Sequence, residues 1–278
     1  MLSLVVRFLV NHPISLSTWS GRFVSRIITE ALEGVGVKVQ HNARSKPYTV
    51  TPILDPRGRA VGRLVPGTQY WFRASLFCGE VDCASAVRAF VGASIKLSTG
   101  EELGIAGVSV SSPEPITDNI EARPAVVQWR VRYWPTVFIF RSHYITWPSP
   151  ARFLSSTAQT LARALRGSEL VMGRGGESIA GVINGVDLRS LVKDLTYNTE
   201  VVGFRVRRVV INLGRGRRTP AFTGTAQYIT YTDRPGLLRA LLSTANTYGV
   251  GKNRPLGLGY VMAEVINEEP TPRSKSPA

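Results

Sequence analysis

The spacing of apolar residues predicts the secondary structure of the first part of the chain. Residues 2–10 are almost continuously apolar, which favours a buried strand. Trp19, Phe23 and Ile27 then recur every four residues and form the apolar stripe of a helix that ends near Gly34. Further elements are expected as strands at 45–54, 58–65 and 68–77, a short helix at 81–91, and strands at 94–98 and 104–112. This order of strands and helices is the ferredoxin-like pattern.

The same order of elements starts again beyond a proline-rich segment, 111–124, which we interpret as a linker. Strand material is expected at 126–144, a helix at 151–165, a glycine-rich loop and a helix within 167–198, long strands at 199–213 and 219–232, and a last strand at 256–266. Another helix begins at Pro235, with Asp233 as its N-cap. No sequence repeat accompanies this pattern, so the duplication is inferred from element order alone.

We therefore predict an α+β chain of two tandem ferredoxin-like (RRM-like) domains, with antiparallel sheets and helices on one face. The N-terminal domain is expected over 1–122 and the C-terminal domain over 123–267. Residues 268–278 are too polar and proline-rich to pack, which predicts a disordered tail.

The charge of the chain narrows the class of partner. Lys and Arg number 34 against 19 Asp and Glu in 278 residues, a net charge of +15, and 28 of those cations are Arg. Such an excess attracts polyanions, nucleic acid first and an acidic membrane surface next. Arg binds phosphate bidentately and stacks on bases, which favours nucleic acid over simple solubility, although a genome or habitat that prefers Arg explains the same count. The longest apolar stretches are about half of what a membrane span needs, and no signal-peptide cleavage site follows them. A cytoplasmic protein without membrane contact is expected.

The two cysteines, Cys78 and Cys83, form one Cys-x4-Cys pair with no second pair and no nearby His. A structural zinc ion needs four ligands, so we interpret them as two ordinary thiols. Asp and Glu are scattered singly, and no cluster suits magnesium. The sequence therefore predicts chemistry without a metal or another cofactor.

A glycine-rich stretch near the carboxyl end is the most distinctive motif. It contains Gly249, Gly251, Gly257 and Gly259 around Lys252, Asn253 and Arg254. A helix leads into this stretch and a strand leaves it, which is the reverse of a dinucleotide fingerprint, and the ending of a P-loop is missing. Glycines here let backbone N–H groups approach phosphate oxygens or let segments pack closely, and Lys252 and Arg254 add charge. A long turn without function is the alternative. Residues 257–261 also resemble an RRM core, but they lack its paired aromatic residues.

The chain resembles a known family at this point, the CRISPR-associated endoribonucleases that process precursor CRISPR RNA, within the repeat-associated mysterious protein (RAMP) superfamily. The glycine stretch 249–261 carries the resemblance, together with "HNARSKPYTVTPIL" at 41–54 and the order of elements over nearly the whole chain. The resemblance implies metal-independent cleavage of CRISPR repeat RNA. The ribose 2′-OH attacks the adjacent phosphate and leaves a 2′,3′-cyclic phosphate and a 5′-OH. The resemblance also implies a monomer or homodimer, with other CRISPR effector subunits as further partners.

Such cleavage needs a base, an acid and a cation, and His suits both proton transfers near neutral pH. By resemblance, His41 matches the family's catalytic His and Lys46 matches the Lys that supports the phosphate. The family's third partner, a Tyr on the first helix, is missing, because Thr29 occupies the approximate position. A solvated loop histidine is the alternative for His41, and we interpret His12 and His143 as structural.

Arginines on the two long strands predict a phosphate-binding surface. Arg205 and Arg207 alternate with apolar residues, and the predicted turn between the strands adds Arg215, Arg217 and Arg218 as a clamp. The same alternation places Arg130 and Arg132 together on one face. An ordinary solvated surface is the alternative for each of these residues.

Two other functions compete with the endoribonuclease. The chain is either a non-catalytic RNA-binding RAMP subunit of a CRISPR effector complex, or a general RNA-binding protein. Tight binding of repeat RNA without product would indicate the first, and equal affinity for unrelated RNAs would indicate the second.

Overall fold

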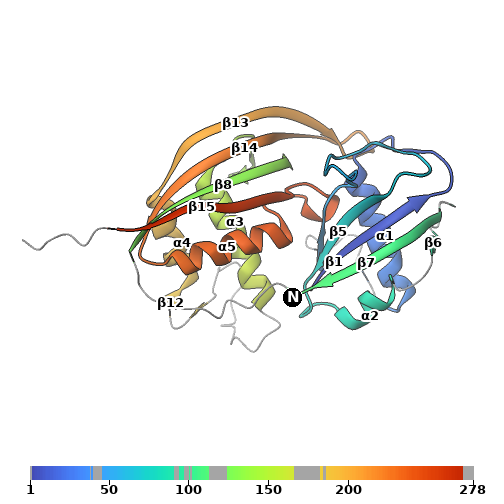
Figure 1. Cartoon of the computed structure of the whole chain (residues 1–278), viewed down its shortest axis with the longest axis horizontal. Helices are drawn as coiled ribbons and strands as arrows, with labels where there is room; N and C mark the ends of the chain where they lie inside the picture. The colour runs from blue at the N-terminus through green and yellow to red at the C-terminus, as the bar shows by residue number, and fades with distance from the viewer. Residues whose placement is uncertain are drawn as a thin grey trace, which may run out of the picture.

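The computed structural model of the chain describes residues 2–37, 39, 46–90, 94–96, 100, 102–112, 124–165, 182–183 and 186–271. These residues form two units, each an antiparallel sheet with helices on one face (Figure 1). We call each unit, its sheet together with its helices, a layer. The N-terminal layer lies within residues 2–112 and the C-terminal layer within residues 124–271. The predicted α+β class with antiparallel sheets is confirmed.

The N-terminal layer is built around β1 (Leu2–Val10). Its sheet has the order β3-β5-β1-β7-β6, and every pairing is antiparallel. The other elements are β2 (Ile14–Ser15), α1 (Ser20–Gly34), β3 (Tyr48–Val50), β4 (Arg63–Leu64), β5 (Tyr70–Leu76), α2 (Cys83–Arg88), β6 (Ser94–Lys96) and β7 (Glu102–Ser111). Leu4, Val6 and Phe8 alternate along β1 and are fully buried in one cluster with the apolar stripe of α1. That burial explains why the period of four identified α1, whereas β1 was predicted from its almost continuous apolar run.

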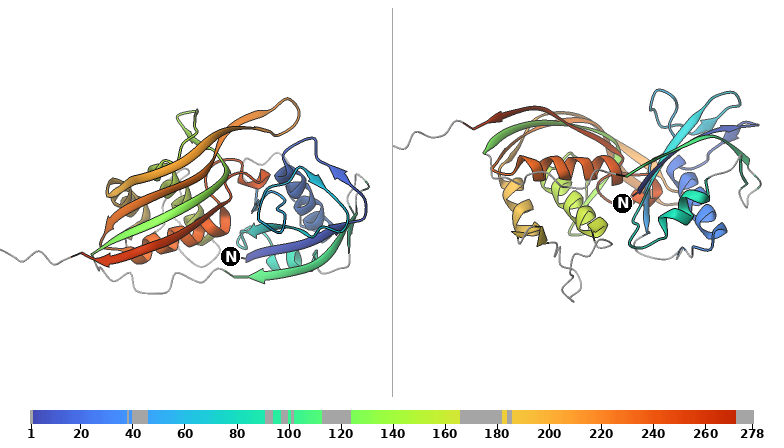
Figure 2. Two further views of the ribbon diagram at one scale, coloured as in Figure 1. Left: turned by 45° about the horizontal axis from the view of Figure 1, so that its top comes forward. Right: turned by 60° about the horizontal axis from the view of Figure 1, so that its bottom comes forward.

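The C-terminal layer has the sheet order β13-β14-β8-β15. Its elements are β8 (Ala125–Thr136), β9 (Phe138–Phe140), β10 (His143–Ile145), α3 (Pro150–Leu165), β11 (Val182–Ile183), β12 (Val186–Asp187), α4 (Leu188–Tyr197), β13 (Thr199–Asn212), β14 (Arg218–Thr232), α5 (Pro235–Tyr248), the 3₁₀ turn η1 (Arg254–Leu256) and β15 (Val261–Pro270). The helices cover one face of the sheet and leave the other open (Figure 2). In the C-terminal sheet β14 lies between β8 and β13, and in the N-terminal sheet β5 lies between β1 and the short β3, which is the strand order of the split βαβ arrangement.

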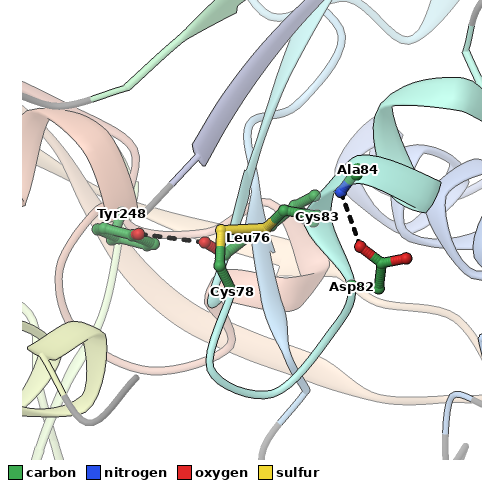
Figure 3. The surroundings of a disulfide bond; sticks show 6 residues. All are labelled: Leu76, Cys78, Asp82, Cys83, Ala84 and Tyr248. Carbon is green, nitrogen blue, oxygen red and sulfur yellow. Dashed lines mark hydrogen bonds between the residues drawn. A yellow bond between two sulfur atoms is a disulfide. The ribbon is translucent and has the colours of Figure 1, made fainter. Parts of the chain in front are cut away.

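Three expectations from the sequence are wrong. Residues 268–270, placed in the tail, continue β15 and pair with β8, because the exposed edge of β8 offers backbone partners that outweigh their polar composition. Asp233 does not cap α5, whose N-cap is Arg234, because the Asp233 carboxylate lies 3.7 Å from the Arg234 guanidinium instead. Cys78 and Cys83 are joined in a disulfide (Figure 3). Residues 113–123 of the linker, 272–278 of the tail and the loop at 167–181 lie outside the described residues.

The two layers meet where β5 faces the end of α5. Arg73 donates through Nη1 to the carbonyl of Asn246 (2.5 Å), and the Ser75 hydroxyl donates to that of Thr247 (2.6 Å). The Tyr248 hydroxyl donates in the opposite direction, to the carbonyl of Leu76 (3.2 Å; Figure 3). The glycine-rich stretch follows α5 directly and therefore starts at the boundary between the layers.

Candidate nucleic-acid interface

The glycine-rich loop, residues 249–259, packs closely between the layers. Gly249 ends α5 with φ 69°, and the N–H of Val250 donates to the Gly259 carbonyl (2.8 Å). A Cβ on Gly259 would lie 1.8 Å from the Val250 carbonyl oxygen, and one on Gly257 would lie 2.5 Å from Cα of Gly21 in α1. The glycines are therefore required for close approach of backbone to backbone.

The N–H groups of these glycines are all used inside the protein. Gly249 donates to Ala245 and Gly257 to Arg254, while Gly259 donates to the carbonyl of Pro135 (2.8 Å). Gly251 donates to the hydroxyl of Ser156 in α3 (2.7 Å). The interpretation that these N–H groups cradle a phosphate is therefore wrong for this structure, because each already has a partner within the chain.

The three polar residues of the loop differ in exposure. The Lys252 side chain is exposed, while its N–H donates to the Val137 carbonyl (2.9 Å), and Asn253 adopts the left-handed conformation with φ 60°. Arg254 points inward, where its Nη1 donates to Thr160 Oγ1 (2.5 Å) and reaches the Gly249 carbonyl (3.4 Å). Burial, together with the nearby Arg163 charge, lowers the pKa of Arg254 to about 10. Of the two predicted cations, Lys252 is therefore the more exposed, and Arg254 is partly buried.

Lys46 lies at the boundary between the layers, just before β3. Its backbone carbonyl accepts a hydrogen bond from Nη2 of Arg163 in α3 (2.7 Å). Partial burial lowers the pKa of the Lys46 ammonium from its usual value, and the Glu33 carboxylate opposes this shift. His41 lies outside the described residues.

Thr29, at the approximate position of the tyrosine expected on the first helix, contacts a tyrosine of β3 instead. Thr29 of α1 shares a hydrogen bond with the hydroxyl of Tyr48 in β3 (2.8 Å), and Ser25 shares a second with the same hydroxyl (3.0 Å). Tyr48 is fully buried, and this burial raises the pKa of its hydroxyl. The cluster therefore anchors β3 against α1 and does not supply an exposed acid or base. His12 and His143 have exposed side chains near the ends of β1 and β9.

The open face of the C-terminal sheet carries a basic groove. Arg205 of β13 pairs with Thr225 of β14, which pairs with Arg132 of β8, so the register brings the two arginines into one row across the sheet. The groove has a volume of about 500 Å³. It is lined by Arg132, Tyr133, Arg205, Val206, Arg207, Thr223, Gly224 and Thr225. The sequence placed Arg205 and Arg207 together but could not place Arg132 beside them, because that neighbour depends on the register.

The neighbours of this groove include other charged and aromatic side chains. The Arg132 guanidinium lies 4.7 Å from the ring centroid of Trp134, whereas Arg130 forms an ion pair with Glu264. The expected apolar face of β13 is partly exposed to solvent, since β13 is an edge strand. Phe204 on this face is 61% exposed. Trp134 is itself buried, so the exposed arginines are the features of this groove that suit a polynucleotide backbone.

The turn between β13 and β14 presents the predicted clamp to solvent. Arg215, Arg217 and Arg218 are all exposed there. Gly214, Arg215 and Gly216 have φ values of 80°, 54° and 72°, and Asn212 Oδ1 accepts the N–H of Gly214 (2.9 Å). The turn is tied to α1 by Arg22, whose Nη1 donates to the Leu213 carbonyl (2.5 Å). These contacts place the turn arginines on a fixed hairpin that continues the groove strands.

Comparison with known proteins finds a family that these features resemble. Residues 132–261, which include the groove, the hairpin and the glycine-rich loop, match the family described as CRISPR-associated endoribonuclease Cas6. The resemblance drawn from the sequence is confirmed. No curated protein sequence matches the chain. Within the part of the chain that the structure describes, no helix is long and apolar enough to cross a bilayer.

The fold is shared with solved Cas6 structures. A Cas6 (TTHB231) product complex has a TM-score of 0.65 and 21% identity, and it covers 95% of this chain and 99% of its own. A Thermus thermophilus Cas6 (TTHB231) structure has a TM-score of 0.62 and 20% identity, with coverage of 95% and 98%. A Cas6 (TTHA0078) product complex has a TM-score of 0.60 and 18% identity, with coverage of 95% and 100%.

Proposed function

We propose that the chain is an endoribonuclease that binds CRISPR repeat RNA and cleaves precursor transcripts. The observation that carries this proposal is the match of residues 132–261 to the Cas6 family. The related structures include two product complexes and a substrate-mimic complex, which agree with an RNA ligand. The exposed arginines of the groove and of the β13–β14 turn supply the charge that such a ligand requires.

The proposed reaction needs no metal ion. A general base removes the proton from the ribose 2′-OH, and its oxygen attacks the adjacent phosphorus. The bond from phosphorus to the 5′ oxygen breaks, and a general acid protonates that oxygen, which leaves a 2′,3′-cyclic phosphate and a 5′-OH. We assign one proton transfer to His41 and stabilisation of the charged phosphorane to Lys46.

Affinity for the RNA is assigned to the basic surface. Arg205 and Arg207 bind phosphates in the groove, Arg215, Arg217 and Arg218 bind them at the hairpin turn, and Lys252 binds them beside the glycine-rich loop. We further propose that the chain folds as two domains, one over residues 1–122 and one that begins at 123 and includes β15 to its end at Pro270. The protein acts in the cytoplasm as a monomer or homodimer, and it can associate with other CRISPR effector subunits.

End-labelled repeat RNA, taken from the array nearest the gene and incubated in EDTA, tests this function. We expect one cut with a 2′,3′-cyclic phosphate on the upstream product. Replacing the 2′-OH next to the scissile phosphate by hydrogen should abolish the cut, and continued cleavage of that substrate would rule out the mechanism. His41→Ala should lower the rate by about 10²–10⁴-fold. His143→Ala, an exposed histidine on β10, is the matched control and should leave the rate unchanged.

One observation favours the non-catalytic RNA-binding subunit as the second candidate. The helix position of the family's tyrosine is Thr29, and the nearby Tyr48 hydroxyl is buried. In that case repeat RNA would bind tightly, no product would form at any enzyme excess, and His41→Ala would bind like the wild type.

A further inference from the structure

Arg163, in the last turn of α3, makes a set of contacts that crosses from the C-terminal to the N-terminal layer. Its Nη2 donates to the carbonyl of Lys46 (2.7 Å). Its Nε and Nη2 also bind the two oxygens of the Glu80 carboxylate (2.6 and 2.7 Å), and its guanidinium carbon lies 4.0 Å from the centroid of the Phe77 ring. The side chain is only 18% exposed. No local sequence pattern indicates this residue, because its partners are 83 and 117 positions away.

The combination of contacts is specific to arginine. A planar guanidinium donates several hydrogen bonds in one plane while its face stacks on an aromatic ring. Lysine keeps the charge and could donate to the Lys46 carbonyl, but an ammonium cannot also form the two-point contact with Glu80. The Lys46 carbonyl is therefore bound by a side chain whose own orientation is fixed on two sides.

Phe77, whose ring contacts the Arg163 guanidinium, also binds the backbone just before β3. The N–H of Phe77 donates to the carbonyl of Pro47 (3.0 Å), so two consecutive carbonyls before β3 are bound. Phe77 stacks on Tyr248 of α5 with ring centroids 4.6 Å apart. The backbone of Lys46 is thus fixed against both α3 and α5, which belong to the other layer.

We infer that Arg163 is a positioning residue for Lys46. The inference rests on the proposed function, in which the Lys46 ammonium stabilises the phosphorane. By binding the Lys46 carbonyl, Arg163 fixes the backbone from which that side chain extends, and it couples the site to the layer that carries the arginine groove. A displacement of about 1 Å in a group that acts on the transition state lowers a rate by about 100-fold.

Single-turnover cleavage of repeat RNA, with enzyme in saturating excess, measures this role. We expect Arg163→Ala to lower the rate constant by about 10- to 100-fold. The Kd for the uncleavable 2′-deoxy repeat should stay within about twofold, because the binding arginines lie elsewhere. Arg163→Lys should recover part of the rate. A residue with a merely structural role would change the folded fraction and the melting temperature, and the rate constant of the folded enzyme would stay the same.

A matched control shows whether a lower cleavage rate results from the contacts of Arg163 or simply from the loss of an arginine ion pair. Arg239 of α5 pairs with Glu268 of β15, so Arg239→Ala removes an arginine–glutamate pair that stays within the C-terminal layer. This variant should cleave at the wild-type rate. Glu80→Ala should lower the rate less than Arg163→Ala does, and the double variant should be no slower than Arg163→Ala, because Glu80 acts through Arg163.

Hydrogen exchange distinguishes failure of this inference from failure of the proposed function. If the wild type does not cleave repeat RNA, the proposed function is wrong. The amides of β3 still test the contact, since they should exchange faster in Arg163→Ala than in Arg239→Ala. If the wild type cleaves, and Arg163→Ala keeps both its rate constant and its exchange protection, Arg163 is not a positioning residue and the endoribonuclease proposal still stands.

Discussion

Single residues explain why the loop after α5 requires glycine. Gly257 has φ 76°, a conformation that residues with a side chain avoid, and a Cβ there would lie 2.5 Å from Cα of Gly21 and 3.2 Å from the N of Pro52. Both neighbours are backbone atoms of the other layer, so neither can move aside as a flexible side chain could. The glycine-rich loop therefore sets how closely the two layers approach.

We expect Gly257→Ala to destabilise the protein strongly. The conformational cost is about 1–2 kcal/mol, and overpacking against backbone adds about 1–3 kcal/mol. The melting temperature should fall by roughly 5–10 °C, measured by thermal denaturation. Gly67→Ala is the matched control, because Gly67 has φ 78° and no atom within 4 Å of its added Cβ. Equal losses in the two variants would mean that contact between the layers does not exclude the methyl group.

The glycine-rich loop also shows how much about single residues could be predicted from the sequence. The four glycines indicated a loop with unusual backbone freedom, and this part of the interpretation agrees with their positive φ values. The use of their N–H groups could not be predicted, since the partners of Gly251 and Gly259 are Ser156 and Pro135, far away in the sequence. The inward turn of Arg254 depends on Thr160 for the same reason.

Among the secondary-structure elements, those with strong periodicity were predicted well and those decided by tertiary pairing were not. The pattern identified α1, α3 and α5, because each buries one apolar stripe. The strand expected at 45–54 shrinks to β3, residues Tyr48–Val50, since prolines at 47 and 52 flank it. The extension of β15 to Pro270 depends on the edge of β8, which local composition does not reveal.

The disulfide between β5 and α2 gives a prediction at the same scale. The single Cys-x4-Cys pair is interpreted from the sequence as two thiols, because a zinc site needs four ligands. The turn after Phe77, with N–H groups of Glu80 and Val81 donating to its carbonyl, brings the Cα atoms of Cys78 and Cys83 to 5.3 Å, and the disulfide results (Figure 3). Reduction should lower the free energy of unfolding by about 2 kcal/mol, the value for closing such a short loop.

Chemical denaturation with and without dithiothreitol measures this loss. The variant with Cys78→Ser and Cys83→Ser is the control. It should match the reduced wild type and should not respond to the reductant. An oxidised wild type that is no more stable than this variant would contradict the prediction. Because Glu80 lies within the closed loop and binds Arg163, the reduced protein should also exchange the amides of β3 faster.

At the scale of the whole molecule, the basic surface follows from the order of strands in the C-terminal sheet. The sequence predicted strands with arginine on alternate positions. Only the order β13-β14-β8 places Arg205 and Arg132 on either side of Thr225. The same hairpin carries Arg215, Arg217 and Arg218 at its turn, so one rigid element presents cations from its middle to its tip.

Binding through such a surface should depend steeply on salt. Each phosphate neutralised contributes about 0.7 to 0.9 to the slope of log K against log salt concentration. Replacing Arg215, Arg217 and Arg218 together by Ala should therefore reduce the slope by roughly 2 to 3 units. Affinity should fall to a similar extent for repeat and unrelated RNA, since phosphate contacts carry no sequence information.

Fluorescence anisotropy with the 2′-deoxy repeat, over a series of salt concentrations, measures this slope. Arg59→Ala is the control, because Arg59 neutralises Asp55 in a turn of the N-terminal layer and its loss should not change the slope. If the triple variant keeps the wild-type slope, the hairpin turn does not contact RNA phosphates, and the charge that binds RNA must then lie in the groove. If the slope falls only when Arg205 and Arg207 are replaced, the charge that binds RNA lies in the groove. Those two side chains line the groove from β13, and the turn lies beyond it.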